Sequence, residues 1–187
     1  MSDYVPGQTY IVGTNGTLVK TSDDGQLLVD TKSAAMYAAQ KGDAYSVVGA
    51  ADSGAETSDF FYLKNHDKRD LVIYKIRMYT PTLDLIINVK LGVTGSPDTG
   101  TAVAPGNMKV GGSLANVTCE QRDGDMALTG GTTVDTLYLD KDFIGEQSWD
   151  YPGGIILPQN AAMVYYVNID PTADVSSETF FFFADPQ

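Results

Sequence analysis

The sequence predicts an all-β protein: an antiparallel two-sheet jelly-roll sandwich with an N-terminal extended arm and one short helix. Short runs of alternating apolar and polar residues recur along the chain, with the period of half-buried strands. Turn-forming Gly, Pro, Asn and Asp separate these runs, and no strand–helix–strand alternation is visible. A chain of 187 residues can bury a core without disulfides. We place the arm, which includes the helix, at residues 1–57 and the sandwich at residues 58–187.

Residues 1–32 form the first part of the arm. Three strand-like pieces lie here, separated by Asn15-Gly16 and Asp24-Gly25, which are dipeptides that tolerate the positive φ angles of hairpin turns. The pieces are too short to enclose a core of their own. We therefore expect this segment to dock on its own sandwich, on a neighbouring subunit or on another protein.

One short helix is expected at residues 33–41. Ser33 can cap its N-terminus, and Gly42 can end it. A helix of this length is marginal in isolation, so it must pack on protein. We expect that contact to be made by Met36, Tyr37 or both.

The centre of the chain is residues 60–91, a stretch that predicts three strands joined by short polar turns. A further short strand is expected before it, at residues 43–49. The third strand of the stretch alternates regularly from Leu83 to Leu91. In the second strand, one face is expected to be apolar and the other basic, with Val72, Tyr74, Ile76 and Met78 opposite Lys75 and Arg77.

Residues 92–112 are rich in Gly, Pro, Ser and Thr, and they predict a long loop of the kind that serves contacts or function. Strands then resume, with turn residues between them. Their expected positions are 115–121, 133–139, 154–157, 161–169 and 178–183.

Four consecutive rings, Phe180–Phe183, lie in the last expected strand. Successive side chains of a strand point to opposite faces, so two rings should face each way. Each ring has at least about 150 Å² of surface, too much to leave in water. One pair is expected in the sandwich core. The other pair should be covered by a partner surface or by the N-terminal arm of the same subunit.

The formal net charge is −12, from 24 acidic and 12 basic residues. Such a surface repels phosphate backbones and anionic lipid, so neither nucleic acid nor a membrane is an expected partner. Five basic residues cluster within 64–77, and eight acidic residues cluster within 120–150. The clusters are either solvated or form complementary patches between copies or on a partner. In the second case, Lys68 and Arg69 would touch acidic surface on a neighbour.

No catalytic or metal-binding pattern is recognisable in the sequence. His66 is the single histidine, and its polar turn favours solvation over a role as a general base. Cys119 alternates with Val117 and is expected to be a small buried apolar group. One histidine and one cysteine do not make a zinc cluster. We expect no cofactor, no metal ion and no enzymatic activity.

The beginning of the chain lacks the basic residues and apolar run of a secretion signal, and a single cysteine cannot form an intramolecular disulfide. No run of about 18 apolar residues is present, so no membrane-spanning helix is expected. We therefore expect synthesis and assembly in a reducing cytoplasm.

Trp149 precedes Asp150-Tyr-Pro-Gly and is open to two interpretations. With Tyr151 and the 92–112 loop it could form an aromatic platform for a sugar ring. Alternatively, its ring closes one end of the sandwich or anchors a subunit contact. The candidate partner-contact residues of the whole chain are Tyr4, Tyr10, Lys68, Arg69, Trp149, Phe181 and Phe183.

Several short motifs follow one another in a recognisable order. They are Gly25-Gln-Leu-Leu-Val, Gly42-Asp-Ala-Tyr-Ser, Phe61-Tyr-Leu-Lys-Asn with Leu71-Val-Ile, Leu128-Thr-Gly-Gly, and Ile155-Ile-Leu-Pro. This order resembles a group of small virion proteins of tailed phages, in which an N-terminal segment precedes a jelly roll. The resemblance covers about residues 25–184 and is carried by turns and strand starts.

The resemblance implies a non-enzymatic capsid decoration (cement) protein or a related head accessory component. Such proteins assemble as homotrimers on the capsid exterior, where they contact the lattice of the major capsid protein and stabilise it. The family has no catalytic residues, so none is assigned here. The alternative is a carbohydrate-binding or receptor-binding module of a phage fibre or tail.

Overall fold

The computed structural model describes residues 33–53, 58–97, 100–123, 125–168 and 173–185, which contain one helix and eleven strands. The helix is α1 (Ala34–Lys41). The first six strands are β1 (Ala44–Ser53), β2 (Ser58–Asn65), β3 (Asp70–Tyr79), β4 (Leu85–Thr94), β5 (Thr101–Ala102) and β6 (Gly106–Asn107). The others are β7 (Val117–Gln121), β8 (Thr129–Leu139), β9 (Gln147–Leu157), β10 (Ala162–Val167) and β11 (Ala173–Ala184).

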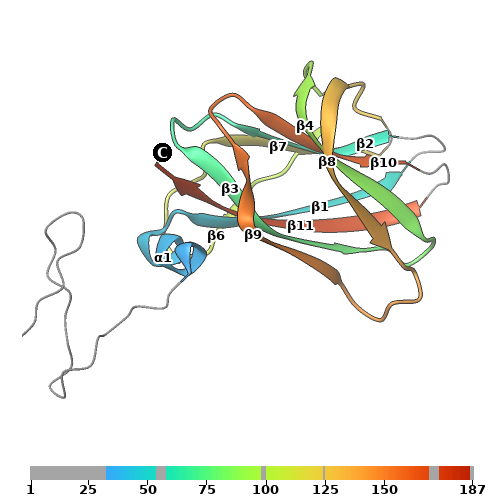
Figure 1. The fold of residues 1–187 in the computed structure, drawn as a ribbon, viewed down its shortest axis with the longest axis horizontal. Helices are drawn as coiled ribbons and strands as arrows, with labels where there is room; N and C mark the ends of the chain where they lie inside the picture. The colour runs from blue at the N-terminus through green and yellow to red at the C-terminus, as the bar shows by residue number, and fades with distance from the viewer. Residues whose placement is uncertain (1–32, 54–57, 98–99, 124, 169–172, 186–187) are drawn as a thin grey trace, which may run out of the picture. The chain divides into compact units, whose positions relative to one another are not determined.

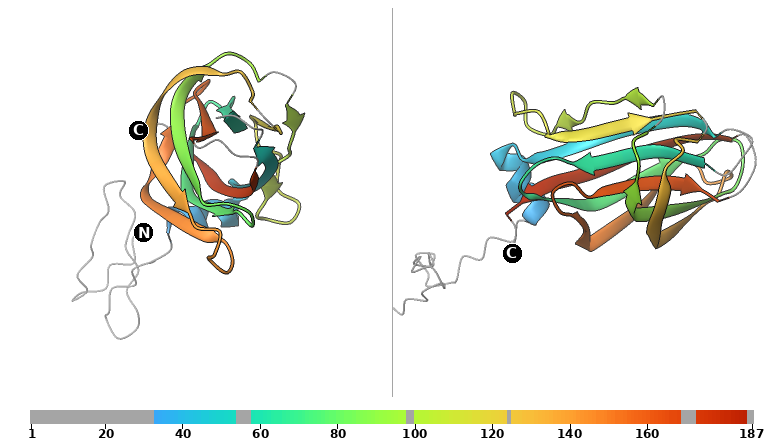
Figure 2. Two further views of the ribbon diagram at one scale, coloured as in Figure 1. Left: turned by 90° about the vertical axis from the view of Figure 1, so that its right-hand side faces the viewer. Right: turned by 90° about the horizontal axis from the view of Figure 1, so that it is seen from above.

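The strands form two antiparallel sheets that pack face to face (Figure 1). The five-stranded sheet has the order β6-β1-β11-β3-β9, and the six-stranded sheet has the order β5-β7-β2-β10-β4-β8. The eight long strands thus form two facing groups, β1-β11-β3-β9 and β2-β10-β4-β8, which is the arrangement of a jelly roll. The predicted fold class is confirmed. Figure 2 shows the two sheets curving around a shared interior.

The connection between β4 and β8 contains three short strands that the jelly roll itself does not require. β6 pairs with β1, whereas β7 pairs with β2 and β5 pairs with β7. The predicted loop at 92–112 is therefore a loop with two two-residue strands in it, and it begins only after β4 ends at Thr94. One connection adds strands to an edge of both sheets.

The compact unit of the sandwich begins at Ala34, earlier than the boundary that the sequence suggests at residue 58. β1 accounts for the difference, because it pairs with β11 along its whole length and is an inner strand of the five-stranded sheet. The first part of the predicted arm, with Tyr4 and Tyr10, lies outside the described residues.

Helix α1 ends as the sequence predicts. Gly42 has a φ of 86°, and the amides of Gly42 and Asp43 donate to the carbonyls of Ala39 (3.1 Å) and Ala38 (2.9 Å), the two bonds of a Schellman cap. The predicted docking through Met36 and Tyr37 is wrong, since both side chains are more than half exposed. The helix instead packs through its alanines, which allow its backbone to approach the sheet closely. This contact contains Ala35, Ala38, Ala39, Ala44, Val72, Tyr74, Phe182 and Ala184.

The three central strands are confirmed as β2, β3 and β4, but the predicted faces of β3 are wrong in its first half. The pairing of β3 with β9 shifts register between Ile73 and Lys75, where a β-bulge interrupts the alternation. Ile76 and Met78 point into the core as expected. Before the bulge the core side chains are Leu71 and Ile73, while Val72 and Tyr74 lie outside under α1.

The partner side of this bulge lies in β9, which is longer than the sequence predicts. Ile73 pairs with Ile155 and Lys75 with Asp150, so the four residues 151–154 face the single residue Tyr74. Gly154 has a φ of 72°, and a Cβ at this position would collide with Cγ1 of Val72. The Pro152-Gly-Gly sequence is thus part of a bulge inside a long strand, of which the sequence pattern predicts only residues 154–157.

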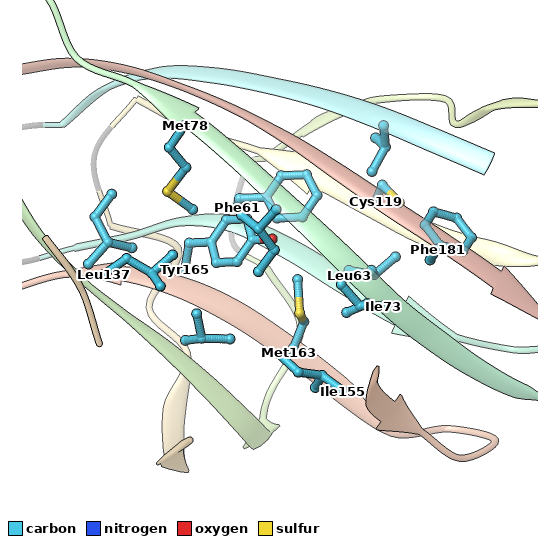
Figure 3. Packing of buried hydrophobic residues seen from close by; sticks show 14 of the residues in the cluster. Phe61, Leu63, Ile73, Met78, Cys119, Leu137, Ile155, Met163, Tyr165 and Phe181 are labelled. Carbon is cyan, nitrogen blue, oxygen red and sulfur yellow. The ribbon is translucent and has the colours of Figure 1, made fainter. Parts of the chain in front are cut away.

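The core between the sheets contains stacked aromatic rings (Figure 3). Phe61 stacks on Tyr165 with ring centroids 5.1 Å apart, and Tyr45 stacks on Phe181 at 5.5 Å. The residues of Phe180–Phe183 alternate as predicted, but Phe181 and Phe183 lie in the core, so the prediction that these two rings contact a partner is wrong. The outward ring of Phe182 is covered by α1 of the same chain, so no partner is needed to bury it.

A strap crosses the outer face of the six-stranded sheet between β7 and β8, and its described residues are 122–123 and 125–128. The amide of Met126 donates to the carbonyl of Asp59 at 3.2 Å, and the Met126 side chain is fully buried. It packs against Tyr62 and Val164 of the sheet below. The strap closes this face and brings polar groups over the start of β2.

Candidate functional site

The basic turn between β2 and β3 uses Arg69 within the chain. Nη1 of Arg69 donates to Asp43 Oδ1 at 2.8 Å, and Nε donates to Asp67 Oδ1 at 3.1 Å. The hydrogen bond from Arg69 lowers the pKa of Asp67, and the same bond raises the pKa of Arg69. The guanidinium also lies 4.9 Å from the ring centroid of Phe183. Of the two predicted contact residues of this turn, Arg69 is engaged internally and Lys68 is exposed.

Members of the two charge clusters seen in the sequence meet inside this chain. Lys75 pairs with Asp150 at 3.3 Å, and Arg77 pairs with Glu146 at 3.7 Å. Arg77 also lies 3.5 Å from Glu178 on β11. On the outer face of the five-stranded sheet, these contacts join β3 to β9, to Glu146 just before β9, and to β11. In this region, the basic and acidic clusters therefore pair with each other within one chain.

His66 and Cys119 each have a structural role: His66 forms a hydrogen bond between two segments, and Cys119 is packed in the core. A ring nitrogen of His66, Nε2, forms a 2.8 Å hydrogen bond with Thr118 Oγ1 and links the β2–β3 turn to β7. Cys119 is buried in the core cluster, as predicted. Burial raises the pKa of its thiol to about 12, so the nucleophilic thiolate is scarce at neutral pH.

Asp59 is a buried carboxylate that the sequence predictions do not include. Its side chain is 4% exposed at the start of β2, and its Oδ1 accepts no hydrogen bond from the described residues. Burial raises the pKa of Asp59 to about 6; Lys90 opposes the shift and Asp125 adds to it. Among the described residues, no group of three or more His, Cys, Asp or Glu side chains is placed to hold a metal ion.

The aromatic platform suggested for sugar binding is not assembled. Trp149 and Tyr151 lie on β9 and are partly buried against the core. Tyr151 donates to Asp135 Oδ2 at 2.7 Å, which ties β9 to β8, and burial followed by this bond raises its pKa. The loop at 92–112 forms the opposite edge of the five-stranded sheet through β6. Trp149 therefore follows the second interpretation, a ring that covers the core.

Two loops at opposite ends of the sandwich expose large apolar side chains. At one end, the β8–β9 tip (residues 140–146) presents Phe143 and Ile144, which are 50% and 99% exposed. At the other end, next to α1, the loop between β6 and β7 presents Met108, Val110 and Leu114. Neither group is predicted by the sequence pattern, because isolated apolar residues in loops carry no periodicity.

A groove opens beside the second of these loops. It is lined by residues 102–105, Leu114, Ala115 and three consecutive residues of β7, Val117 to Cys119, and it has a volume of about 300 Å³. Nearly all of the lining is apolar, and Leu114 on its rim is 87% exposed. We call it the β7 groove. It reaches the core, because Cys119 belongs to both.

Comparisons with protein-family models, with curated proteins and with solved structures each gave no match for this chain. In the part of the chain that the structure describes, no helix has the length and apolar character needed to cross a membrane.

Proposed function

We propose that this protein is a non-enzymatic structural component of a phage virion, a capsid decoration or cement protein that binds the outside of the head as a homo-oligomer and stabilises it. Its partners are further copies of itself and the lattice of the major capsid protein. Its place is the capsid exterior, after synthesis in the host cytoplasm.

The observation that carries the proposal is the exposure of large apolar side chains in two loops at opposite ends of one sandwich. Ile144 and Val110 have essentially no cover from their own chain. Large apolar side chains exposed together in one loop favour a surface that binds other proteins. With one such surface at each end, a single copy can join two neighbouring molecules, as an oligomer that covers a shell requires.

The fold is consistent with this role. Jelly rolls are a common architecture of viral capsid domains, and lectins share it, so the fold alone supports the proposal only by analogy. A repetitive lattice also multiplies modest contacts, because each bound copy that touches two neighbours gains from effective concentration.

The test is binding to heads of the phage that encodes the protein, prepared without it. Purified protein should saturate these heads at a fixed number of copies per particle and raise the temperature at which they open. Ile144→Asp or Val110→Asp should weaken binding, whereas Val48→Asp, at an exposed apolar position outside both loops, should not. Absence of saturable binding, or binding without any gain in head stability, would refute the cement role.

A further inference from the structure

We propose that the β8–β9 tip of one copy inserts Phe143 and Ile144 into the β7 groove of a second copy, so that copies join head to tail. The proposal deepens the assembly role and rests on the oligomeric part of the function proposed above. It assigns a defined contact to the exposed side chains of the tip and to Leu114 on the rim of the groove.

The tip is held in shape by its own hydrogen bonds. The amide of Asp142 donates to Asp140 Oδ1 at 2.8 Å, and the amide of Phe143 donates to the Asp140 carbonyl at 3.2 Å. The amide of Lys141 donates to Asp84 Oδ1 at 3.0 Å, which anchors the tip to the neighbouring β3–β4 connection. A preformed turn loses little conformational entropy on binding. The two apolar side chains are thus presented ready to dock.

The tip cannot fill the groove of its own chain. The ends of β8 and β9 that carry the tip pair with Leu85 and Met78, at the end of the sandwich away from α1. The groove lies near the opposite end, where Val117 pairs with Asn65 just before the β2–β3 turn. The ten residues of β3 that separate these ends span roughly 30 Å. A second copy is therefore required.

The groove suits these side chains in size and chemistry. Its volume of about 300 Å³ leaves room for an aromatic and an aliphatic side chain. Its walls come from small apolar residues and from Leu114, and Cys119 lies at its base with an un-ionised thiol. An aromatic anchor in an apolar pocket is the usual centre of a tight protein contact.

Charge selects this pairing among the contacts that two copies could make. With a net charge of −12, two copies repel each other in most orientations. The tip is acidic, with Asp140, Asp142 and Glu146 against Lys141 within the tip and Arg77 of β3, which pairs with Glu146. The segment that forms most of the groove, residues 101–117, has no acidic residue and carries an exposed Lys109. The tip therefore meets fewer like charges at this end than over most of the surface, with Glu120 beside Ala102 as the nearest acid on β7.

A contact between two different surfaces leaves one tip and one groove free on each pair. Such a heterologous contact continues until a ring closes, or it grows into an open chain. A closed ring of three copies would be the homotrimer that the sequence resemblance implies.

The test uses two variants of the full chain in solution and needs no phage heads. The double variant Phe143→Ser/Ile144→Ser removes the two apolar side chains of the tip. Leu114→Glu places an acidic side chain on the rim of the groove. Wild-type protein should sediment as an oligomer larger than 20.0 kDa, and each variant should weaken self-association by about 100-fold or more. An equimolar mixture of the two variants should form a heterodimer of twice 20.0 kDa and nothing larger, because one intact tip and one intact groove remain.

Val48→Glu is the matched control, because it adds the same charge at an apolar position that is 60% exposed on β1. It should leave the oligomer unchanged. A wild-type protein that stays monomeric at micromolar concentration would overturn the contact, as would an oligomer that survives both variants or a mixture that stays monomeric. Each of these results leaves head binding to be judged separately. Head binding by a monomer would uphold the proposed virion role while refuting the head-to-tail contact.

Discussion

Tyr165 and Thr179 join the two sheets through a hydrogen bond of 2.6 Å between their hydroxyl groups, with both side chains fully buried. Tyr165 lies on β10 in the six-stranded sheet, and Thr179 lies on β11 in the five-stranded sheet. Burial raises the pKa of the Tyr165 phenol, so the group stays neutral and can donate. The pair is a polar link across an otherwise aromatic interior.

The costs of removing the two hydroxyl groups should not add, because each single variant leaves the other hydroxyl buried without its partner. Tyr165→Phe or Thr179→Val leaves a buried hydroxyl without its partner and should lower the free energy of unfolding by about 1–3 kcal/mol. The double variant should lose clearly less than the sum of the two. Urea unfolding of the four proteins gives the coupling energy. Simple additivity would show that the hydroxyls do not act together.

Asp59 should make the protein more stable as pH falls from neutral toward 4. Its pKa in the folded chain is raised to about 6 from the ordinary 3.8, so the folded state holds the proton more tightly than the unfolded state. The stabilisation is complete below the unfolded pKa and is lost as pH rises through the folded value. From the size of the shift, the contribution is at most about 3 kcal/mol.

Asp59→Asn should remove this pH dependence and raise the free energy of unfolding above pH 6. Asp125→Asn is the companion variant, because it removes the nearby charge that raises the Asp59 pKa yet keeps the oxygen that accepts the Asp59 amide at 3.3 Å. It should shift the transition to lower pH. Thermal unfolding followed from pH 4 to pH 8 measures both effects, and a wild-type curve that Asp59→Asn leaves unchanged would contradict the assignment.

Two adjacent glycines in β9 should respond differently to the same change. Gly154→Ala places a methyl group against Val72 at a φ of 72° and should cost about 1–3 kcal/mol. Gly153→Ala meets no atom within 4 Å and should be neutral or stabilise by up to about 1 kcal/mol. Chemical denaturation distinguishes the two. Equal effects would mean that the bulge adapts to a side chain at either position.

Substitutions at the neighbouring residues Lys68 and Arg69 should also have different effects on the free energy of unfolding. Arg69→Gln breaks the bonds to Asp43 and Asp67 and should destabilise the fold by about 1–3 kcal/mol, less at high salt. Lys68→Gln changes an exposed side chain and should stay within about 0.5 kcal/mol of wild type. The comparison is made by urea unfolding at low and high salt. A cost shared equally by both variants would show that the turn is only a solvated basic patch.

Much of the fold follows from local pattern, because strand alternation and turn residues act over a few neighbouring positions. The bulge in β3 could not be predicted from local pattern, because the register shift at Tyr74 depends on the extra residues that β9 places opposite it. The helix contact was predicted through large residues, yet the signal for the true face was present. Ala35, Ala38 and Ala39 have the spacing of one helical face, and small residues there permit close packing.

The candidate surfaces were harder to predict. An aspartate at the start of the apolar run in β2 was a visible hint of the buried Asp59, and Phe143-Ile144 between acidic residues was a hint of an exposed tip. The β7 groove had no comparable signal, because it is assembled from segments that are separated along the chain and shaped by the β4–β8 connection.

That connection also bears on aggregation. It pairs β6 with Tyr45 and Ser46 of β1 and pairs β7 with β2, which occupies part of the backbone that would otherwise invite a foreign strand. Further along β1, the side chain of Gln121 accepts the amide of Ala50 at 2.8 Å. On the far side, the β9 bulge and the two positive-φ glycines of β8, Gly130 and Gly131, distort the other edges. Copies of this chain are therefore expected to tolerate crowding without merging their sheets into amyloid-like stacks.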